Sequence, residues 1–107
     1  MALVRGRVYA ATIDSTVGEM LYLVVSNNAR NHGLGSALVV RLTTTPKLPR
    51  PSIVELPHGE SFNDRVSCDD IEVLYVDEVA RDAGALSART MQAVDNGLKA
   101  ALALKPN

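Results

Sequence analysis

The sequence predicts a mainly β domain, a small twisted β-barrel or sheet against which one C-terminal amphipathic helix packs. Short apolar runs follow one another up to about Gly84 and are separated by turn-forming Gly, Pro, Asn and Asp. Only after Ser87 does the apolar spacing change to the three- and four-residue repeat of a helix. A chain of 107 residues suits one domain, which we place over residues 1–107.

Strand-like patterns account for most of the chain. Apolar residues alternate along the first segment, whereas residues 21–25 form a continuous apolar run, typical of a strand buried on both faces. Pro46, Pro49 and Pro51 remove backbone donors, so we expect an irregular connection there. The expected strands are residues 5–13, 21–25, 37–42, 52–56, 65–68 and 71–74, with a seventh short piece near Gly84.

Polar segments separate these strands. Residues 14–18 have the composition of a turn, and residues 26–36, with three Asn and two Gly, predict a loop. The acidic run at residues 69–72 lacks matching His or further spaced carboxylates. It therefore predicts a solvated turn beside a strand rather than a metal site.

The C-terminal segment has the signals of a helix. Ser87 is the expected N-cap. Met91, Val94, Leu98 and Leu102 then recur at three- and four-residue spacing, and Lys105-Pro106 is expected to end the helix. Gly97, inside this helix, either weakens it by about 1 kcal/mol relative to Ala or permits close packing.

Charge is unevenly distributed, although the net charge is only −1. Residues 1–50 carry six basic and two acidic side chains, a balance of +4, whereas residues 51–107 carry five and ten, a balance of −5. Such asymmetry can mark a face for a polyanion, or can reflect two solvated faces that differ.

Cysteine content and the N-terminus bear on the compartment. Cys68 is the single cysteine, so no intrachain disulfide is expected, and a small buried residue is favoured over a nucleophile. The N-terminus lacks a signal-peptide pattern, and no apolar run approaches about 18 residues. We therefore expect a cytoplasmic protein with no membrane partner.

Two strand ends carry side chains that can bind phosphate and ribose. One apolar run leads into Ser, Asn and Arg at residues 26–31, and the next leads into Arg41 and the Thr run at residues 43–45. All of these side chain types contact sugar–phosphate backbones. We expect the two segments to form two walls of one RNA groove in a dimeric fold.

Six pieces of the sequence, in order and spanning nearly the whole chain, resemble the MazF/PemK family of toxin endoribonucleases. No single piece is specific to the family, but the six pieces in this order and at this spacing are much stronger evidence than any one of them. The pieces are residues 5–9 (Arg-Gly-Arg-Val-Tyr), 14–18 (Asp-Ser-Thr-Val-Gly), 23–27 (Leu-Val-Val-Ser-Asn), 40–44 (Val-Arg-Leu-Thr-Thr), 69–71 (Asp-Asp-Ile) and 86–95, which opens Leu-Ser and ends Met-Gln-Ala-Val-Asp.

The resemblance implies an SH3-like β-barrel of the CcdB/PemK type with a C-terminal helix, assembling as a homodimer. It also implies the toxin of a type II toxin–antitoxin system, which cleaves single-stranded RNA at a short sequence without metal or cofactor. In that chemistry the ribose 2′-hydroxyl attacks the adjacent phosphate and leaves a 2′,3′-cyclic phosphate and a 5′-hydroxyl. A cognate antitoxin protein would occupy the same groove.

The family's usual catalytic pair is an Arg just before the second strand and a Thr at the end of the third. Thr43 matches the Thr, but the Arg position falls on Met20, and the preceding loop is reduced to Gly18-Glu19. Arg41 lies two residues from Thr43, hence on the same strand face. We therefore expect Thr43 and Arg41 to be catalytic, although a strand Thr and an outward Arg also occur without function.

Further residues are candidates for RNA binding, although Asn is also common in loops for conformational reasons. His32 and His58 are each followed by Gly in expected loops. A catalytic His is a weaker alternative. The RNA-binding candidates are Arg5, Arg7, Glu19, Asn27, Asn28, Arg30, His32 and Thr44.

The sequence bears on two other functions. The main alternative is a catalytically degenerate family member that binds RNA or antitoxin without cleavage. Met20 is the reason for this alternative. Toxins of the same fold that poison DNA gyrase typically end in a Trp-Gly-Ile-like tail. This chain has no Trp and ends Ala-Leu-Lys-Pro-Asn, so gyrase poisoning is disfavoured.

Overall fold

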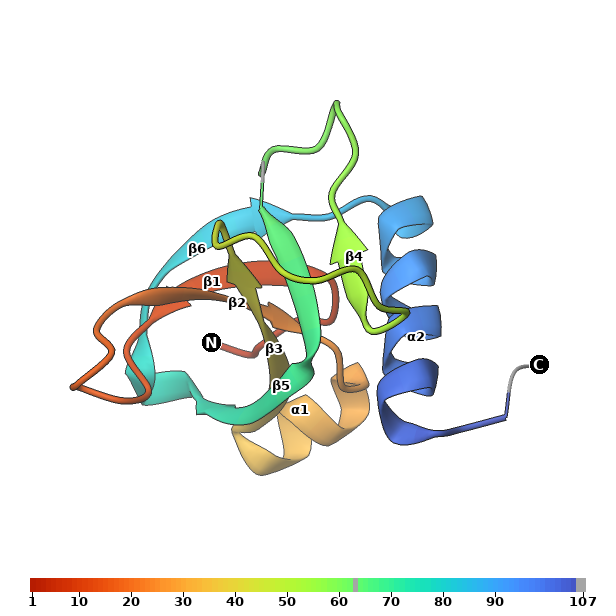
Figure 1. Ribbon diagram of the computed structural model, residues 1–107. Coiled ribbons are helices and arrows are strands. Elements are labelled where there is room, and N and C mark those ends of the chain that lie inside the picture. Colours follow the sequence, from red (N-terminus) through yellow and green to blue (C-terminus); the bar gives the residue numbers. More distant parts are fainter. Residues whose placement is uncertain (63, 106–107) are drawn as a thin grey trace.

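The computed structural model describes residues 1–62 and 64–105, and over these ranges it shows one antiparallel sheet of six strands, two α-helices and a 3₁₀ turn (Figure 1). The elements in chain order are β1 (Arg7–Ala11), β2 (Met20–Val24), α1 (Asn28–Leu34), β3 (Ser36–Thr43), β4 (Ile53–Glu55), β5 (Arg65–Tyr75), η1 (Val76–Glu78), β6 (Val79–Ala85) and α2 (Ala88–Leu102). The predicted mainly β fold with a C-terminal helix is confirmed.

The sheet has the strand order β4-β5-β3-β2-β1-β6 and curls strongly, so that each face encloses its own core (Figure 1). One core lies between the sheet and α2 and includes Leu23, Val40, Leu42 and Val94. The opposite face gathers a second core around Tyr9 and the neighbouring buried side chains. Burial on both faces explains the continuous apolar sequence of β2.

The expected pair of short strands at residues 65–68 and 71–74 is wrong, because both belong to the single strand β5. It is one strand whose register against β3 shifts between Val40, which pairs with Ile71, and Arg41, which pairs with Ser67. Residues 68–70 are therefore the extra residues of a bulge, which bends the strand. The acidic residues that were expected to form a turn, Asp69 and Asp70, lie in this bulge.

The expected loop at residues 26–36 is wrong, because most of this segment forms the helix α1. Asn27 Oδ1 accepts a hydrogen bond from the Arg30 backbone N–H at 2.8 Å, which is an N-cap, and Gly35 closes the helix at a φ of +63°. Buried Asn31 also bonds to Ser26, whose hydroxyl accepts from the Leu38 N–H at 2.8 Å. The Asn and Gly content thus marks the two ends of a short helix.

α2 begins as expected. Ser87 caps the helix by accepting from the Thr90 N–H at 3.2 Å, and Ala103 ends it in the left-handed conformation. The expected stop at Lys105-Pro106 comes later than this end, and Pro106 lies outside the described residues. In the described part of the chain, no helix has the length and apolar character needed to cross a membrane.

Gly97 lies where α2 is closest to the sheet. A Cβ added there would lie 2.8 Å from Cys68 Sγ and 3.1 Å from Val54 Cγ2. Cys68 is fully buried, and burial raises the pKa of its thiol to about 11, so it is a packing residue as expected. The close-packing alternative for Gly97 is therefore confirmed.

Glu60 joins the β4–β5 connection to the start of α2. Its carboxylate accepts hydrogen bonds from the Thr90 hydroxyl, the Ser87 hydroxyl at 2.7 Å and the Ser87 N–H at 3.2 Å. A negative charge at this end also complements the helix dipole. The Thr90 hydroxyl first, and then Ser87, hold the pKa of Glu60 below its ordinary value.

We predict that Gly97→Ala lowers the free energy of unfolding. Overpacking costs about 1–3 kcal/mol, which exceeds the gain of about 1 kcal/mol in helix propensity. Gly33→Ala in α1 is the matched control, since its added Cβ meets nothing within 4 Å, and it should be neutral or stabilising. Urea unfolding of both variants checks this, and a Gly97→Ala protein as stable as wild type would contradict it.

We predict that Glu60 makes the stability of the fold acid-sensitive. Because its folded pKa is lowered, its contribution is present above the ordinary value of 4.5 and disappears as the pH falls through the folded pKa. Between about pH 7 and pH 3, the melting temperature of Glu60→Gln should fall less than that of wild type. Glu55→Gln removes the same charge from β4, where the carboxylate bonds Arg65 and not the cap of α2, and parallel curves for all three proteins would contradict the prediction.

Candidate active site

A cleft of about 310 Å³ lies where β3 ends beside the start of β2. β2 and β3 are antiparallel with Leu21 opposite Leu42, so Met20 and Thr43 follow at the same end of the pair. The cleft is lined by Glu19, Met20, Leu21, Leu42, Thr43, Thr44, Thr45, Asp64 and Arg81.

The threonine wall of this cleft is held by short-range bonds. Thr43 Oγ1 accepts from the Thr45 N–H at 3.1 Å, and the Thr44 carbonyl accepts from Arg65 Nη1 at 3.3 Å. Arg65 is anchored in turn by Glu55, whose carboxylate accepts from Arg65 Nε at 2.7 Å. These bonds fix the chain at the point where it leaves the sheet, and Thr43 remains partly accessible.

Opposite this wall, Glu19 forms an ion pair with Arg81 of β6, with Arg81 Nη1 3.1 Å from Glu19 Oε2. Sequence reasoning missed Arg81. It is 62 residues from Glu19 in the chain, and only sheet pairing brings it to the cleft. No motif around Arg81 signals this position.

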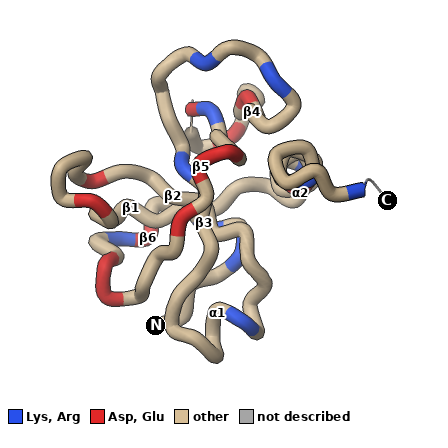
Figure 2. Tube along the Cα trace, turned by 60° about the horizontal axis from the view of Figure 1, so that its bottom comes forward, with Lys and Arg blue, Asp and Glu red and all other residues tan. Residues whose placement is uncertain are grey.

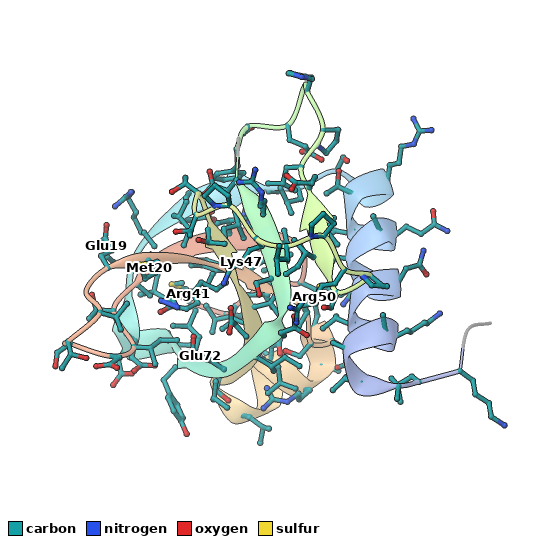
Figure 3. The ribbon with its side chains drawn as sticks, in the orientation of Figure 1. Glu19, Met20, Arg41, Lys47, Arg50 and Glu72 are labelled. Carbon is teal, nitrogen blue, oxygen red and sulfur yellow. The ribbon has the colours of Figure 1, made fainter. Side chains whose placement is uncertain are left out.

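Arg41 lies on the expected face of β3 but opens into a neighbouring cleft of about 380 Å³. It pairs across the sheet with Tyr22, and its side chain lies between Met20 and Glu72 in the view of Figure 3. Its Nε is buried without a hydrogen-bond partner among the described residues. Asp14, Asp70 and Glu72 also line this second cleft.

Within one chain the two segments lie apart, so a groove with both of them as walls would be built across a dimer. Because β2 and β3 are antiparallel, Val24 pairs with Val39, and the segment that follows β2 lies beside the start of β3. Residues 26–31 are thus at the opposite end of β3 from Thr43. At about 3.3 Å per residue, the two ends of this strand are roughly 20 Å apart.

The polar residues at that other end have structural roles in the fold. Asn27 caps α1, Asn28 Oδ1 accepts from the Arg5 N–H at 2.7 Å, and Arg30 Nη1 donates to the Ser36 carbonyl at 3.0 Å. His32 is exposed in the last turn of α1. Of the candidate residues there, His32 is the one for which the described part of the structure records no side-chain bond.

Arg5 and Arg7 are also engaged. The Arg5 guanidinium donates to the Val25 carbonyl and to the Asp95 carboxylate, which ties the sheet to α2. Arg7 Nε donates to Asp82 at 2.7 Å, which raises the pKa of Arg7 and lowers that of Asp82. Arg7 and Asp82 are both partly exposed, so this pair contributes little stability.

The charge asymmetry does not separate into one basic and one acidic face. Figure 2 shows basic and acidic residues interleaved over the sheet. The reason is that three of the five ion pairs among the described residues join a basic residue of the first half to an acidic residue of the second half. These are Arg5–Asp95, Arg7–Asp82 and Arg50–Asp69, whereas Glu19–Arg81 joins the halves in the opposite sense.

A larger cleft, about 530 Å³, lies elsewhere, between the β4–β5 connection and the start of α2. Glu60, Ser87 and Thr90 line it and are already bonded to one another as a helix cap. His58 lines this cleft and is exposed, and it is not among the residues that line the Thr43 cleft. Capping therefore accounts for three polar side chains of this larger cleft, Glu60, Ser87 and Thr90, and the smaller Thr43 cleft is the stronger candidate.

Comparison with known proteins gives the family. The chain matches, over residues 4–102, the family described as PemK-like, MazF-like toxin of type II toxin-antitoxin system. It is 36% identical over 103 residues to Endoribonuclease MazF4 of Mycobacterium tuberculosis, covering 96% of this chain and 95% of the relative. Endoribonuclease MazF1 of Mycobacterium bovis matches to the same extent.

Solved structures agree. A mycobacterial endoribonuclease superposes with a TM-score of 0.90 at 33% identity, covering 100% of this chain and 97% of that one. A mycobacterial endoribonuclease in complex with its cognate antitoxin gives 0.90 at 35% identity, covering 99% and 100%. The MazE–MazF structure from Deinococcus radiodurans, at 21% identity and a TM-score of 0.80, supports the fold alone. This chain therefore belongs to the PemK-like, MazF-like toxin family of type II toxin–antitoxin systems.

Proposed function

We propose that the protein is an endoribonuclease that cleaves single-stranded RNA without a metal ion, at the cleft around Thr43. The observation that carries this proposal is the composition of that cleft. Hydroxyls from residues 43–45, a carboxylate at Glu19 and a guanidinium at Arg81 converge in one cavity, in a chain whose relatives are named endoribonucleases. A cellular RNA substrate, whether mRNA, tRNA or rRNA, implies that the protein acts in the cytoplasm.

The reaction that suits these groups is an internal transesterification. The ribose 2′-oxygen forms a bond to phosphorus, the bond from phosphorus to the 5′-oxygen breaks, and a 2′,3′-cyclic phosphate and a 5′-hydroxyl result. A base takes the 2′-hydroxyl proton, an acid returns a proton to the 5′-oxygen, and donors stabilise the charged phosphorane. We assign the base to Glu19 and one of the donors to the Thr43 hydroxyl.

RNA bound at this cleft would extend to either side of it. Thr44 adjoins the scissile position, and Arg41 lies in the neighbouring cleft, where it can bind the adjacent nucleotides. Arg5, Arg7, Asn27, Asn28, Arg30 and His32 are too remote to contact the same nucleotide. They would contact RNA only further along its path or across a second copy of the chain.

A homodimer is part of the same proposal. Three side chains of β5 that alternate along the strand, Ile71, Val73 and Tyr75, are 38%, 40% and 54% exposed. Such an apolar strip on a sheet favours a protein partner. A relative has been solved with its cognate antitoxin, and we propose that an antitoxin also binds this chain and silences its site.

A member of the family that binds RNA or antitoxin without cleaving is the second candidate. Met20 favours it, since this side chain places a thioether in the cleft where a cation would stabilise the phosphorane. This candidate predicts RNA binding with a clear salt dependence but no cleavage.

We predict that the purified protein cuts a long single-stranded RNA into discrete fragments in excess chelator. Fragments that a polynucleotide kinase labels directly have 5′-hydroxyl ends, which the transesterification requires. A folded protein that leaves RNA intact at high concentration would contradict the proposal and favour the non-cleaving candidate.

We predict that Thr43→Val lowers the cleavage rate by a factor of about 10²–10³, because Val keeps the shape of Thr but removes one donor to the phosphorane. Thr43→Ser keeps the hydroxyl and should retain most of the activity. Single-turnover rates at saturating RNA give the comparison. Equal loss in both variants would assign Thr43 a packing role instead.

A further inference from the structure

Arg81 is held at the edge of the Thr43 cleft in a way that leaves it available to a ligand. Its side chain is 61% exposed, and its bond partner within residues 1–62 and 64–105 is Glu19, through Nη1 alone. A guanidinium has five N–H donors in a planar fork that suits phosphate. Most of this donor capacity is therefore unused in the free protein.

Sheet pairing fixes where Arg81 lies. Arg81 of β6 pairs with Ala10 of β1, Ala10 pairs with Leu21 of β2, and Leu21 pairs with Leu42 of β3. These residues form one row across four adjacent strands, and Thr43 follows the last of them. Because paired residues share a face, the row directs Arg81 to the side of the sheet where Leu21 and Leu42 line the cleft. The Thr43 side chain alternates to the other side, and the two meet at the cleft because it lies at the open end of these strands.

The other basic side chains near Thr43 are less suited to a phosphate in this cleft. Arg65 is bonded to both Glu55 and the Thr44 carbonyl and holds the threonine wall. Arg41 opens into the neighbouring cleft, among Asp14, Asp70 and Glu72. Arg81 is the basic side chain among the described residues that line the Thr43 cleft.

The geometry points to Arg81 as a catalytic residue that contacts the non-bridging oxygens of the scissile phosphate and stabilises the phosphorane. Glu19 holds the guanidinium in place before RNA binds. The inference rests on the proposed function for the chemistry it assists, but the phosphate contact itself is independent of cleavage. It gives the cleft the cation that Met20 does not supply.

The test compares Arg81→Ala with Arg41→Ala and with Arg89→Ala, which removes an exposed charge from α2 on the other side of the fold. Single-turnover cleavage in chelator at saturating RNA should fall about 10²–10³-fold in Arg81→Ala. Arg89→Ala should match wild type, and Arg41→Ala should weaken RNA binding more than it slows the saturated rate. Arg81→Ala cleaving like Arg89→Ala would overturn the assignment.

A second variant separates loss of the cation from loss of structure. Met20→Arg in the Arg81→Ala protein returns a guanidinium to the same cleft and should recover much of the lost rate. A double variant as slow as Arg81→Ala would show that the loss was not that of a cation, and would overturn the proposal.

Binding measurements separate this inference from the proposed function. The probe is a single-stranded oligonucleotide with 2′-O-methyl sugars, which lacks the attacking hydroxyl. Losing one phosphate contact should lower the slope of log affinity against log salt by about 0.7 in Arg81→Ala relative to Arg89→Ala. If wild type cleaves no RNA, the proposed function fails, and this slope still decides: a lower slope supports the phosphate site and equal slopes overturn it.

Discussion

The antiparallel pairing of β3 with both β2 and β5 is the constraint on which the rest of the structure depends. It places the end of β3 at the start of β2, so Thr43 lies beside Glu19 and Met20 and away from the residues that follow β2. The bulge in β5 bends the sheet at the level of Arg41. Arg41 and Thr43 consequently share a strand face yet open into different clefts.

Ion pairing between distant parts of the chain determines where the charges of this protein lie. A basic first half and an acidic second half could have given a polyanion-binding face, but folding brings the two halves together, and their charges partly cancel. Exposed ion pairs of this kind add little stability. Their larger effect is local, because each pair leaves a guanidinium at a fixed place, and a phosphate recognises such places rather than a broad field.

The elements with a strong hydrophobic period could be predicted from sequence: β1, β2, β3 and α2 with its Ser87 cap lie within a few residues of expectation. α1 was missed because its Asn and Gly residues are common to loops and to helix caps. β5 was divided because a bulge tolerates Asp69 and Asp70 inside a strand. For the candidate site, Thr43 and Glu19 could be found by resemblance, whereas Arg81 is joined to them only by non-local pairing.

The origin of Arg81 on a distant strand bears on how this cleft can obtain a positively charged side chain. The β1–β2 connection is short here, and Met20 follows it directly, so this part of the chain offers the cleft only the carboxylate of Glu19. A carboxylate alone would repel a phosphodiester. Its pairing with Arg81 offsets the charge of Glu19 and brings a guanidinium within reach from β6, while Asp64 adds a second carboxylate to the lining. Electrostatic stabilisation depends on where a charge lies and not on which strand carries it. A sheet that aligns four strands in one row can therefore take the cation from a different strand and leave the threonine wall unchanged.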